Sequence, residues 1–171
     1  MININEFANT IFEMTEKTSY RFIEMFEETQ RIDETITYVY IKAFYMHTLR
    51  LYLEANKNLR KFDELYYAYK MTLENYYKSI NRGIAPDILE SIKEAFDTSF
   101  DMMQSLKFKD LYDGYVFRHH IVDCFELLRS ILEKKSEKSV RVDLFENYIS
   151  VFRRQAEEVI DYVAKEIKRV K

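Results

Sequence analysis

Apolar side chains recur at helical spacing through residues 1–82, a stretch that contains neither glycine nor proline. Steps of three and four residues place such side chains on one face of an α-helix. The polar segment 54–64 interrupts the pattern and is the predicted place of a bend or turn. An unbroken helix would extend about 110 Å, so we expect two long helices or a helical hairpin instead. The apolar positions are Phe7, Ile11, Met14, Thr18, Phe22, Met25, Thr29, Ile32, Ile36, Val39, Ala43 and Met46, and then Phe62, Tyr66, Tyr69, Leu73, Tyr76 and Ile80.

Residues 83–86 form the clearest interruption of the helical pattern. Gly83 stands where the C-terminal end of a helix favours glycine, and Pro86 fits the first turn of the next helix. Residues 87–171 then carry three further apolar stripes, which predict a three-helix C-terminal part. The stripes are Leu89, Ile92, Phe96, Phe100 and Met103; Leu111, Tyr115, Val122, Phe125 and Leu132; and Phe145, Ile149, Phe152, Ala156, Val159, Val163, Ile167 and Val170.

The pattern as a whole predicts an all-α fold with a single helical domain over residues 1–171. Long antiparallel helices would form a bundle, either compact or with an extended, coiled-coil-like arm. The composition agrees, because 2 Gly and 1 Pro supply little of the turn chemistry that closely spaced strands require. The chain also has 14 Tyr and 13 Phe but no Trp. These rings have two interpretations: an aromatic core, or a surface that meets a protein or a hydrophobic body.

Charge and sequence signals limit the class of partner and the compartment. The net charge of −3, with acidic and basic residues interleaved, gives no drive towards nucleic acid, so nucleic acid is an unlikely partner. The single cysteine, Cys124, rules out an internal disulfide and indicates a reducing environment. The first residues lack the features of a signal peptide, and no run of 18 apolar residues occurs. We expect a cytoplasmic protein with no transmembrane segment.

The chain lacks the motifs of several common chemical sites. A phosphate-binding loop needs glycines at fixed spacing, and a ferritin-like di-iron bundle needs two Glu-x-x-His pairs; neither occurs. His119, His120 and Cys124 form a cluster with ligand character, and His47 is a candidate third ligand beside His120 and Cys124. A partly buried histidine and a core cysteine are the commoner outcome, and no third group activates a Cys–His nucleophile. We therefore predict a protein that is not an enzyme, with no catalytic residue, no metal and no cofactor.

The order of features in the C-terminal half resembles a known family. In "SLKFKDLYDGY", Ser105 and the aromatic Phe108 are followed by Gly114 inside an apparent helix. A charged loop then leads to "VRVDLFENYISVFRRQAEEV", where Arg141 and Asp143 open a final helix of coiled-coil character. Residues 86–165 are thus similar to the accessory subunit of the polyhydroxyalkanoate synthases, the PhaE and PhaR type. The chain departs from the family in having no proline before Arg141 and no tryptophan.

The resemblance implies a non-catalytic accessory or scaffold subunit that takes part in polyhydroxyalkanoate biosynthesis. Such a subunit binds and activates a separate synthase, an α/β-hydrolase-like enzyme with a cysteine nucleophile, and can meet the hydrophobic surface of a polymer granule. The partner-binding residues that the resemblance implies are Phe108, Leu111, Gly114, Arg141 and Asp143. Gly114 permits close approach either of another helix of this chain or of the partner backbone.

The helical pattern alone supports an alternative class. An orphan helical-bundle interaction protein, of viral or archaeal type, would self-associate or bind another protein without any synthase. The regular stripes predict a homo-oligomer in either case, because seams with a repeat of about 3.5 residues are typical of associating helices.

Overall fold

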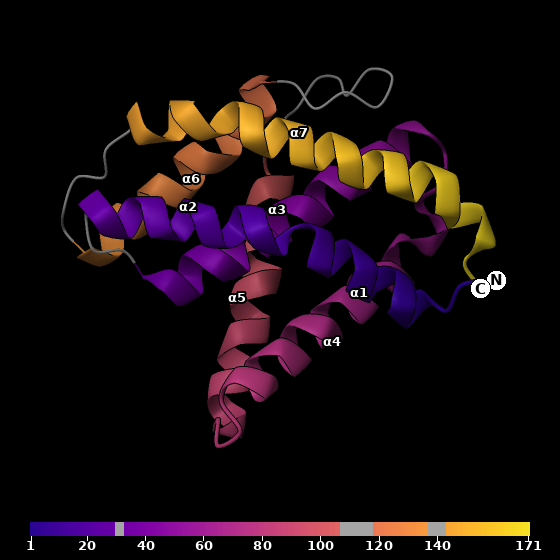
Figure 1. The fold of residues 1–171 in the computed structure, drawn as a ribbon, viewed down its shortest axis with the longest axis horizontal. Helices are drawn as coiled ribbons and strands as arrows, with labels where there is room; N and C mark the ends of the chain where they lie inside the picture. Colours follow the sequence, from indigo (N-terminus) through magenta and orange to yellow (C-terminus); the bar gives the residue numbers. More distant parts are fainter. Residues whose placement is uncertain (30–32, 107–117, 137–142) are drawn as a thin grey trace.

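The computed structural model describes residues 1–29, 33–106, 118–136 and 143–171, with side chains over these ranges except at 26–29, 118–119, 135–136 and 143–147. Within these ranges the chain is helical apart from its turns and one isolated β-bridge between Ile2 and Val170. The all-α prediction is therefore confirmed (Figure 1). The elements are α1 (Ile4–Met14), α2 (Glu16–Thr29), α3 (Glu34–Ala55), η1 (Leu59–Lys61), α4 (Phe62–Ile80), α5 (Pro86–Gln104), α6 (Arg118–Ser136), α7 (Asp143–Glu166) and η2 (Ile167–Arg169), where η denotes a 3₁₀-helix.

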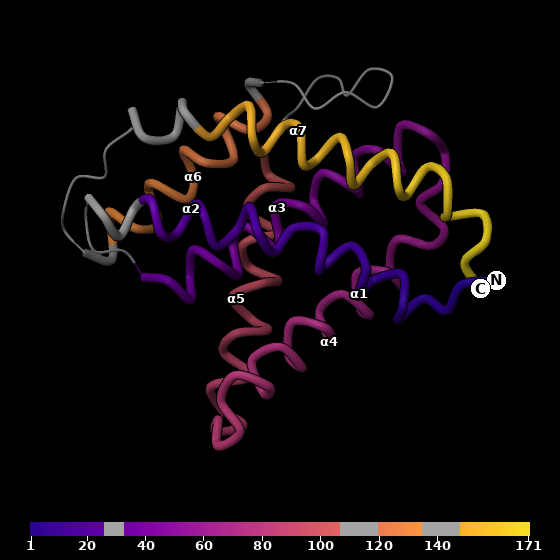
Figure 2. The backbone as a smooth tube through the Cα atoms, in the orientation of Figure 1, coloured from indigo at the N-terminus to yellow at the C-terminus, as the bar shows by residue number. Residues whose placement is uncertain are grey.

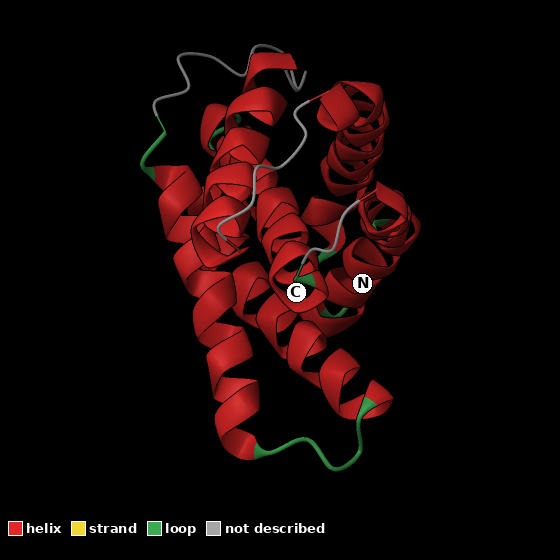
Figure 3. Cartoon of the chain, turned by 90° about the vertical axis from the view of Figure 1, so that its left-hand side faces the viewer, coloured by secondary structure: helices red, strands yellow, loops and turns green. Residues whose placement is uncertain are grey.

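Helix α3 is the centre of the molecule. Every side chain from Thr37 to Leu49 is buried, so this helix has no solvent-facing side over three turns. A helix that is covered all round belongs to the interior rather than to a surface layer. Helices α1 and α2 cross the molecule in succession, α3 packs against α2, and α7 runs back across α2 (Figure 1). The antiparallel arrangement expected from the sequence is thus present. Seen from the side, the described elements are all helices (Figure 3).

Aromatic rings fill much of the core where α2, α3, α6 and α7 meet. The rings of Phe125 and Phe152 have centroids 4.5 Å apart, and Phe22 lies 5.3 Å from each of them. Phe44 adds a fourth ring, 5.5 Å from Phe125. Such edge and tilted contacts stabilise beyond the area that the rings bury. The structure therefore supports the interpretation of the aromatic residues as core.

The first 82 residues form four α-helices, where the sequence predicted two. The chain bends at Thr15, whose hydroxyl donates to the carbonyl of Phe12 at 2.9 Å and so competes with the helical ladder. A second break precedes α3, where the Asp33 carboxylate accepts from the backbone N–H of Ile36 at 3.0 Å and caps the helix. The third break, at 56–61, lies in the predicted segment 54–64, and Lys57 adopts a left-handed φ of 55° there. Local hydrogen-bonding side chains thus divided an apolar stripe that appeared continuous.

The turn between α4 and α5 lies where the sequence predicts it, but Gly83 plays a different role in it from the one expected. Helix α4 ends at Ile80 with Asn81 as its cap, and α5 begins at Pro86. Gly83 is not in the left-handed conformation expected of a capping glycine. Instead its N–H donates to the Asn81 side-chain oxygen at 3.2 Å. The two helices converge on this turn, which projects from the rest of the molecule (Figure 1).

The stripe on α7 packs inside the chain rather than on an arm. Of its eight positions, the seven whose side chains are described are all buried, from Ile149 to Val170. The end of the chain then lies beside its start, because Ile2 donates its N–H to the carbonyl of Arg169 at 3.0 Å (Figure 2). Among the described residues, the part that projects is the α4–α5 hairpin (Figure 1) and not the α7 stripe, which is buried. Because the α7 stripe is buried inside the chain, it is not a surface on which a second copy could pack. The homo-oligomer therefore stays a prediction without support from this stripe.

Candidate functional site

The partner-binding residues implied by the family resemblance are not positioned by the structure. Phe108, Leu111, Gly114 and Arg141 lie outside the described residues. Asp143 is the first residue of α7, but its side chain is not described. The two interpretations of Gly114 are therefore untested, and these five residues remain predictions.

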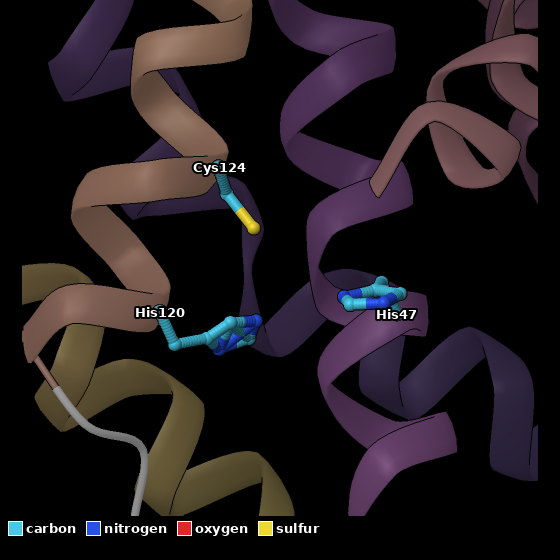
Figure 4. A group of neighbouring side chains, drawn as sticks. All are labelled: His47, His120 and Cys124. Carbon is cyan, nitrogen blue, oxygen red and sulfur yellow. The ribbon is translucent and has the colours of Figure 1, made fainter. Parts of the chain in front are cut away.

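Three side chains with ligand character come together between α3 and α6. His120 and Cys124 lie one turn apart on α6, and His47 faces them from α3 (Figure 4). One nitrogen of each ring and the Cys124 sulfur all lie within 4.8 Å of one another. The sequence singled out these three residues but predicted separate structural roles. The fold instead assembles them into one group. The side chain of His119 lies outside the described ones.

The His47–His120–Cys124 group is closed off from water. All three side chains are at most 1% exposed. The ring of Phe44 lies 5.5 Å from His120, and the ring of Phe100 lies 5.9 Å from His47. Burial lowers the pKa of His47 to about 4, with the Arg50 charge adding to the effect and a hydrogen bond with Gln104 opposing it.

Burial likewise raises the pKa of the Cys124 thiol well above its usual value, and Asp123 adds to this. A neutral thiol out of reach of solvent is a poor nucleophile. The group therefore does not suit attack on a substrate that enters from water, although its donors are those that transition metals prefer.

A buried ion pair at the bend between α1 and α2 is a feature that the sequence analysis missed. The Lys42 ammonium on α3 is fully buried and lies 2.5 Å from a Glu16 carboxylate oxygen. It also donates to the carbonyl of Phe12 at 2.9 Å and to the Thr15 hydroxyl at 2.8 Å. Tyr38 donates its phenolic hydrogen to the same carboxylate. The ammonium thus satisfies backbone and hydroxyl groups that the bend at Thr15 leaves at the end of α1.

A signal for this ion pair was present in the sequence. Lys42 is the one Lys, Arg, Asp or Glu between Glu34 and Arg50, in a stretch that is otherwise apolar or neutral. A lysine in such a setting is buried only when it has partners. The sequence could not show that those partners come from the α1–α2 bend.

A groove lies where the beginning of α3 meets the α4–α5 turn. It encloses about 510 Å³, and its walls are mainly apolar. Two isoleucines on its rim are exposed, Ile80 by 60% and Ile88 by 51%. Ile80 continues the apolar stripe of α4, but its side chain is exposed because the helix extends past the body that would cover it. The apolar side chains that line the groove include Ile36, Val39, Tyr77, Ile80, Ile88 and Ile92.

Comparison with protein-family models, curated proteins and solved structures finds no significant match to this chain. Among the described residues, none of the helices is long and apolar enough to cross a membrane.

Proposed function

We propose that this chain is a non-catalytic accessory or scaffold subunit that binds a protein partner through the groove at the α4–α5 turn. The exposure of Ile80 and Ile88 beside an apolar groove carries this proposal. Contiguous exposed apolar surface with a polar rim is typical of protein–protein contacts. Asn81 and Ser91 supply polar groups at this site.

The occupant that fits best is an apolar segment of another protein. A small molecule lying in the groove would leave the rim isoleucines in water. A helix or loop that places two apolar side chains in the groove would cover the rim as well, and so would remove more apolar surface from solvent. The other large apolar side chains that are exposed among the described residues, such as Tyr67 and Val151, do not line this groove.

The buried chemistry of the chain agrees with a role in binding rather than catalysis. Strongly displaced pKa values occur at Lys42, at His47, at Cys124 and at several tyrosines. Burial is the first cause in each case. Lys42, His47 and Cys124 do not line the described groove, whereas Tyr77, whose pKa is also raised by burial, does. A catalytic acid or base must reach its substrate, and Lys42, His47 and Cys124 are all buried.

The specific partner that we propose is the catalytic subunit of a polyhydroxyalkanoate synthase. Its support is the resemblance of residues 86–165, and the partner would be activated by this chain. The groove lies at the start of α5, whereas Phe108, Leu111 and Gly114 follow its end. The described groove residues of α5 reach only as far as Ala95 in the sequence, so variants at these and at the three later positions can be made independently.

The alternative is that the groove binds a second copy of this chain. This keeps the orphan interaction protein as the second candidate, and Ile80 and Ile88 would then be buried in a homodimer. Light scattering of the purified chain over a range of concentrations separates the two: the proposal predicts no dimer that depends on Ile80 and Ile88.

The test compares three proteins purified from the native host with a tag at the N-terminus, which lies away from the α4–α5 turn (Figure 1). They are the wild type, the double variant Ile80→Asp/Ile88→Asp, and the control Tyr67→Asp. Tyr67 is 63% exposed on the same helix and does not line the groove. Thermal unfolding by circular dichroism checks that each protein folds.

We expect one protein to be recovered in stoichiometric amount with the wild type and with Tyr67→Asp, but not with the double variant. For the specific form, that protein is a synthase that polymerises hydroxyacyl-CoA faster when this chain is added. Retention of the partner by a folded double variant contradicts the groove as docking site. A groove-dependent partner that does not polymerise hydroxyacyl-CoA contradicts the synthase assignment and leaves the accessory role.

A further inference from the structure

We propose that His47, His120 and Cys124 bind a divalent transition-metal cation of the Zn²⁺ class and so link α6 to α3. The inference rests on the donor set and its geometry and does not depend on the proposed partner. Two imidazole nitrogens and a sulfur are donors that Zn²⁺, Co²⁺ and related ions prefer, whereas Mg²⁺ and Ca²⁺ require oxygen.

The spacing of the donor atoms is close to that of a coordinated ion. Zn–N bonds of about 2.0–2.1 Å and Zn–S bonds of about 2.3 Å place two nitrogens and one sulfur in a tetrahedral site roughly 3.3–3.6 Å apart. The three donor atoms here lie within 4.8 Å of one another. Closing the difference takes a movement of about 1 Å, which is within the reach of small changes in side-chain torsions.

Helix geometry holds the three ligand side chains in place. His120 and Cys124 are at i and i+4, so successive turns of α6 present them on one face. Figure 4 shows both side chains pointing towards α3, where His47 lies opposite. Tyr40 on α3 donates its hydroxyl hydrogen to the backbone carbonyl of Cys124, which fixes the position of α6 at the ligand itself.

The surroundings also suit a metal centre. Gln104 makes a side-chain hydrogen bond with His47, and a partner of this kind commonly orients a metal-bound histidine. The rings of Phe44 and Phe100 cover the histidines and exclude water. One thiolate and two neutral imidazoles reduce the net charge of the site with a divalent ion to +1. Burying this charge in an apolar site costs less than burying a bare dication.

The three residues supply three of the four positions of a tetrahedral site, and no further His, Cys, Asp or Glu joins the group among the described residues. The consequence for the fold is a link between the N-terminal helices and α6. The metal-loaded protein should unfold at a higher temperature than the metal-free protein, since an ion that binds only the folded state stabilises it.

The experiment uses the full chain purified without a polyhistidine tag, stripped with a chelator and then titrated with Zn²⁺ or Co²⁺. Calorimetry gives stoichiometry and affinity, and the absorption of the Co²⁺ form reports thiolate ligation and tetrahedral geometry. Cys124→Ala removes one ligand. The matched control is Thr48→Ala, because Thr48 is buried next to His47 but donates its hydroxyl hydrogen to the carbonyl of Phe44 at 3.0 Å.

We expect one ion per chain in the wild type and in Thr48→Ala, a thiolate-to-cobalt charge-transfer band, and a rise in melting temperature with Zn²⁺. Cys124→Ala should bind at least about 100-fold more weakly. Equal affinity in Cys124→Ala overturns the proposal. A wild-type Co²⁺ spectrum without thiolate charge transfer also overturns the proposal. This second measurement needs only the wild type, so it holds even if Cys124→Ala does not fold.

Discussion

Replacing Lys42 with methionine gives a sharp test of the buried ion pair, because methionine has a similar length and no charge. In the wild type the ammonium lies in a fully buried position beside Glu16 and 3.9 Å from the centre of the Phe12 ring. Glu16 keeps a side chain that is 25% exposed, so its carboxylate can be solvated in the variant. The informative quantity is therefore the pH dependence of the difference between the two proteins.

The direction and magnitude follow from the pKa of Lys42. Burial lowers this pKa from 10.5 to about 8, against the opposing charge and hydrogen bond of Glu16. The unfolded chain thus keeps the proton up to pH 10.5, whereas the folded chain releases it near pH 8. Since the unfolded state binds more protons in this window, the free energy of unfolding rises with pH across it. The full effect is about 3 kcal/mol, of which about 2 kcal/mol falls between pH 7 and 9.5.

Urea unfolding followed by circular dichroism, at several values between about pH 7 and 9.5, measures this difference. Cys124 and the buried tyrosines have raised pKa values and lower the stability as the pH rises. They occur in both proteins, so they cancel when the variant is subtracted from the wild type. Between pH 7 and 9.5 we expect the free energy of unfolding of the wild type to rise by about 2 kcal/mol relative to that of Lys42→Met. A difference that stays constant to within about 0.5 kcal/mol would refute the lowered pKa of Lys42.

Two further substitutions test the α4–α5 turn and the aromatic core. Gly83→Ala should leave the free energy of unfolding unchanged or raise it by up to about 1 kcal/mol, because an added methyl group meets only the Asn81 side-chain oxygen at 3.9 Å; a clear loss in urea unfolding would show that the turn needs glycine. Phe152→Ala should lower the free energy of unfolding by about 3–5 kcal/mol, because this ring is 1% exposed and packs against Phe22 and Phe125. A loss below about 1 kcal/mol in the same assay is incompatible with that packing.

Periodicity predicted the helical fold well, because amphipathic stripes bury one face whatever the tertiary partner. The stripe from Leu89 to Met103 is buried on α5 at each of its positions, and so are the described positions on α7. The number of helices was less predictable. The breaks at Thr15 and Asp33 depend on single side-chain hydrogen bonds, and these do not interrupt an apolar repeat. A repeat also says nothing of a helix such as α3, which is buried all round.

The candidate sites depended on contacts between distant segments, which a single sequence does not reveal. The i and i+4 spacing of His120 and Cys124 was visible, but only the fold brings His47 to them. The groove was not foreseen because Ile80 continues the apolar stripe of α4 and is exposed only where the helix outruns its neighbours. The residues that carry the family resemblance lie mostly outside the described ranges, so that prediction stands on its motifs alone.

Hydrogen–deuterium exchange tests the central claim most directly. Exchange in this chain would be followed alone and when saturated with the protein that co-purifies with it in stoichiometric amount. A partner that docks in the groove should slow exchange across residues 77–95, which include the end of α4 and the start of α5. A stable complex with unchanged exchange over these residues, or the recovery of no stoichiometric partner at all, would contradict a subunit that binds through this groove.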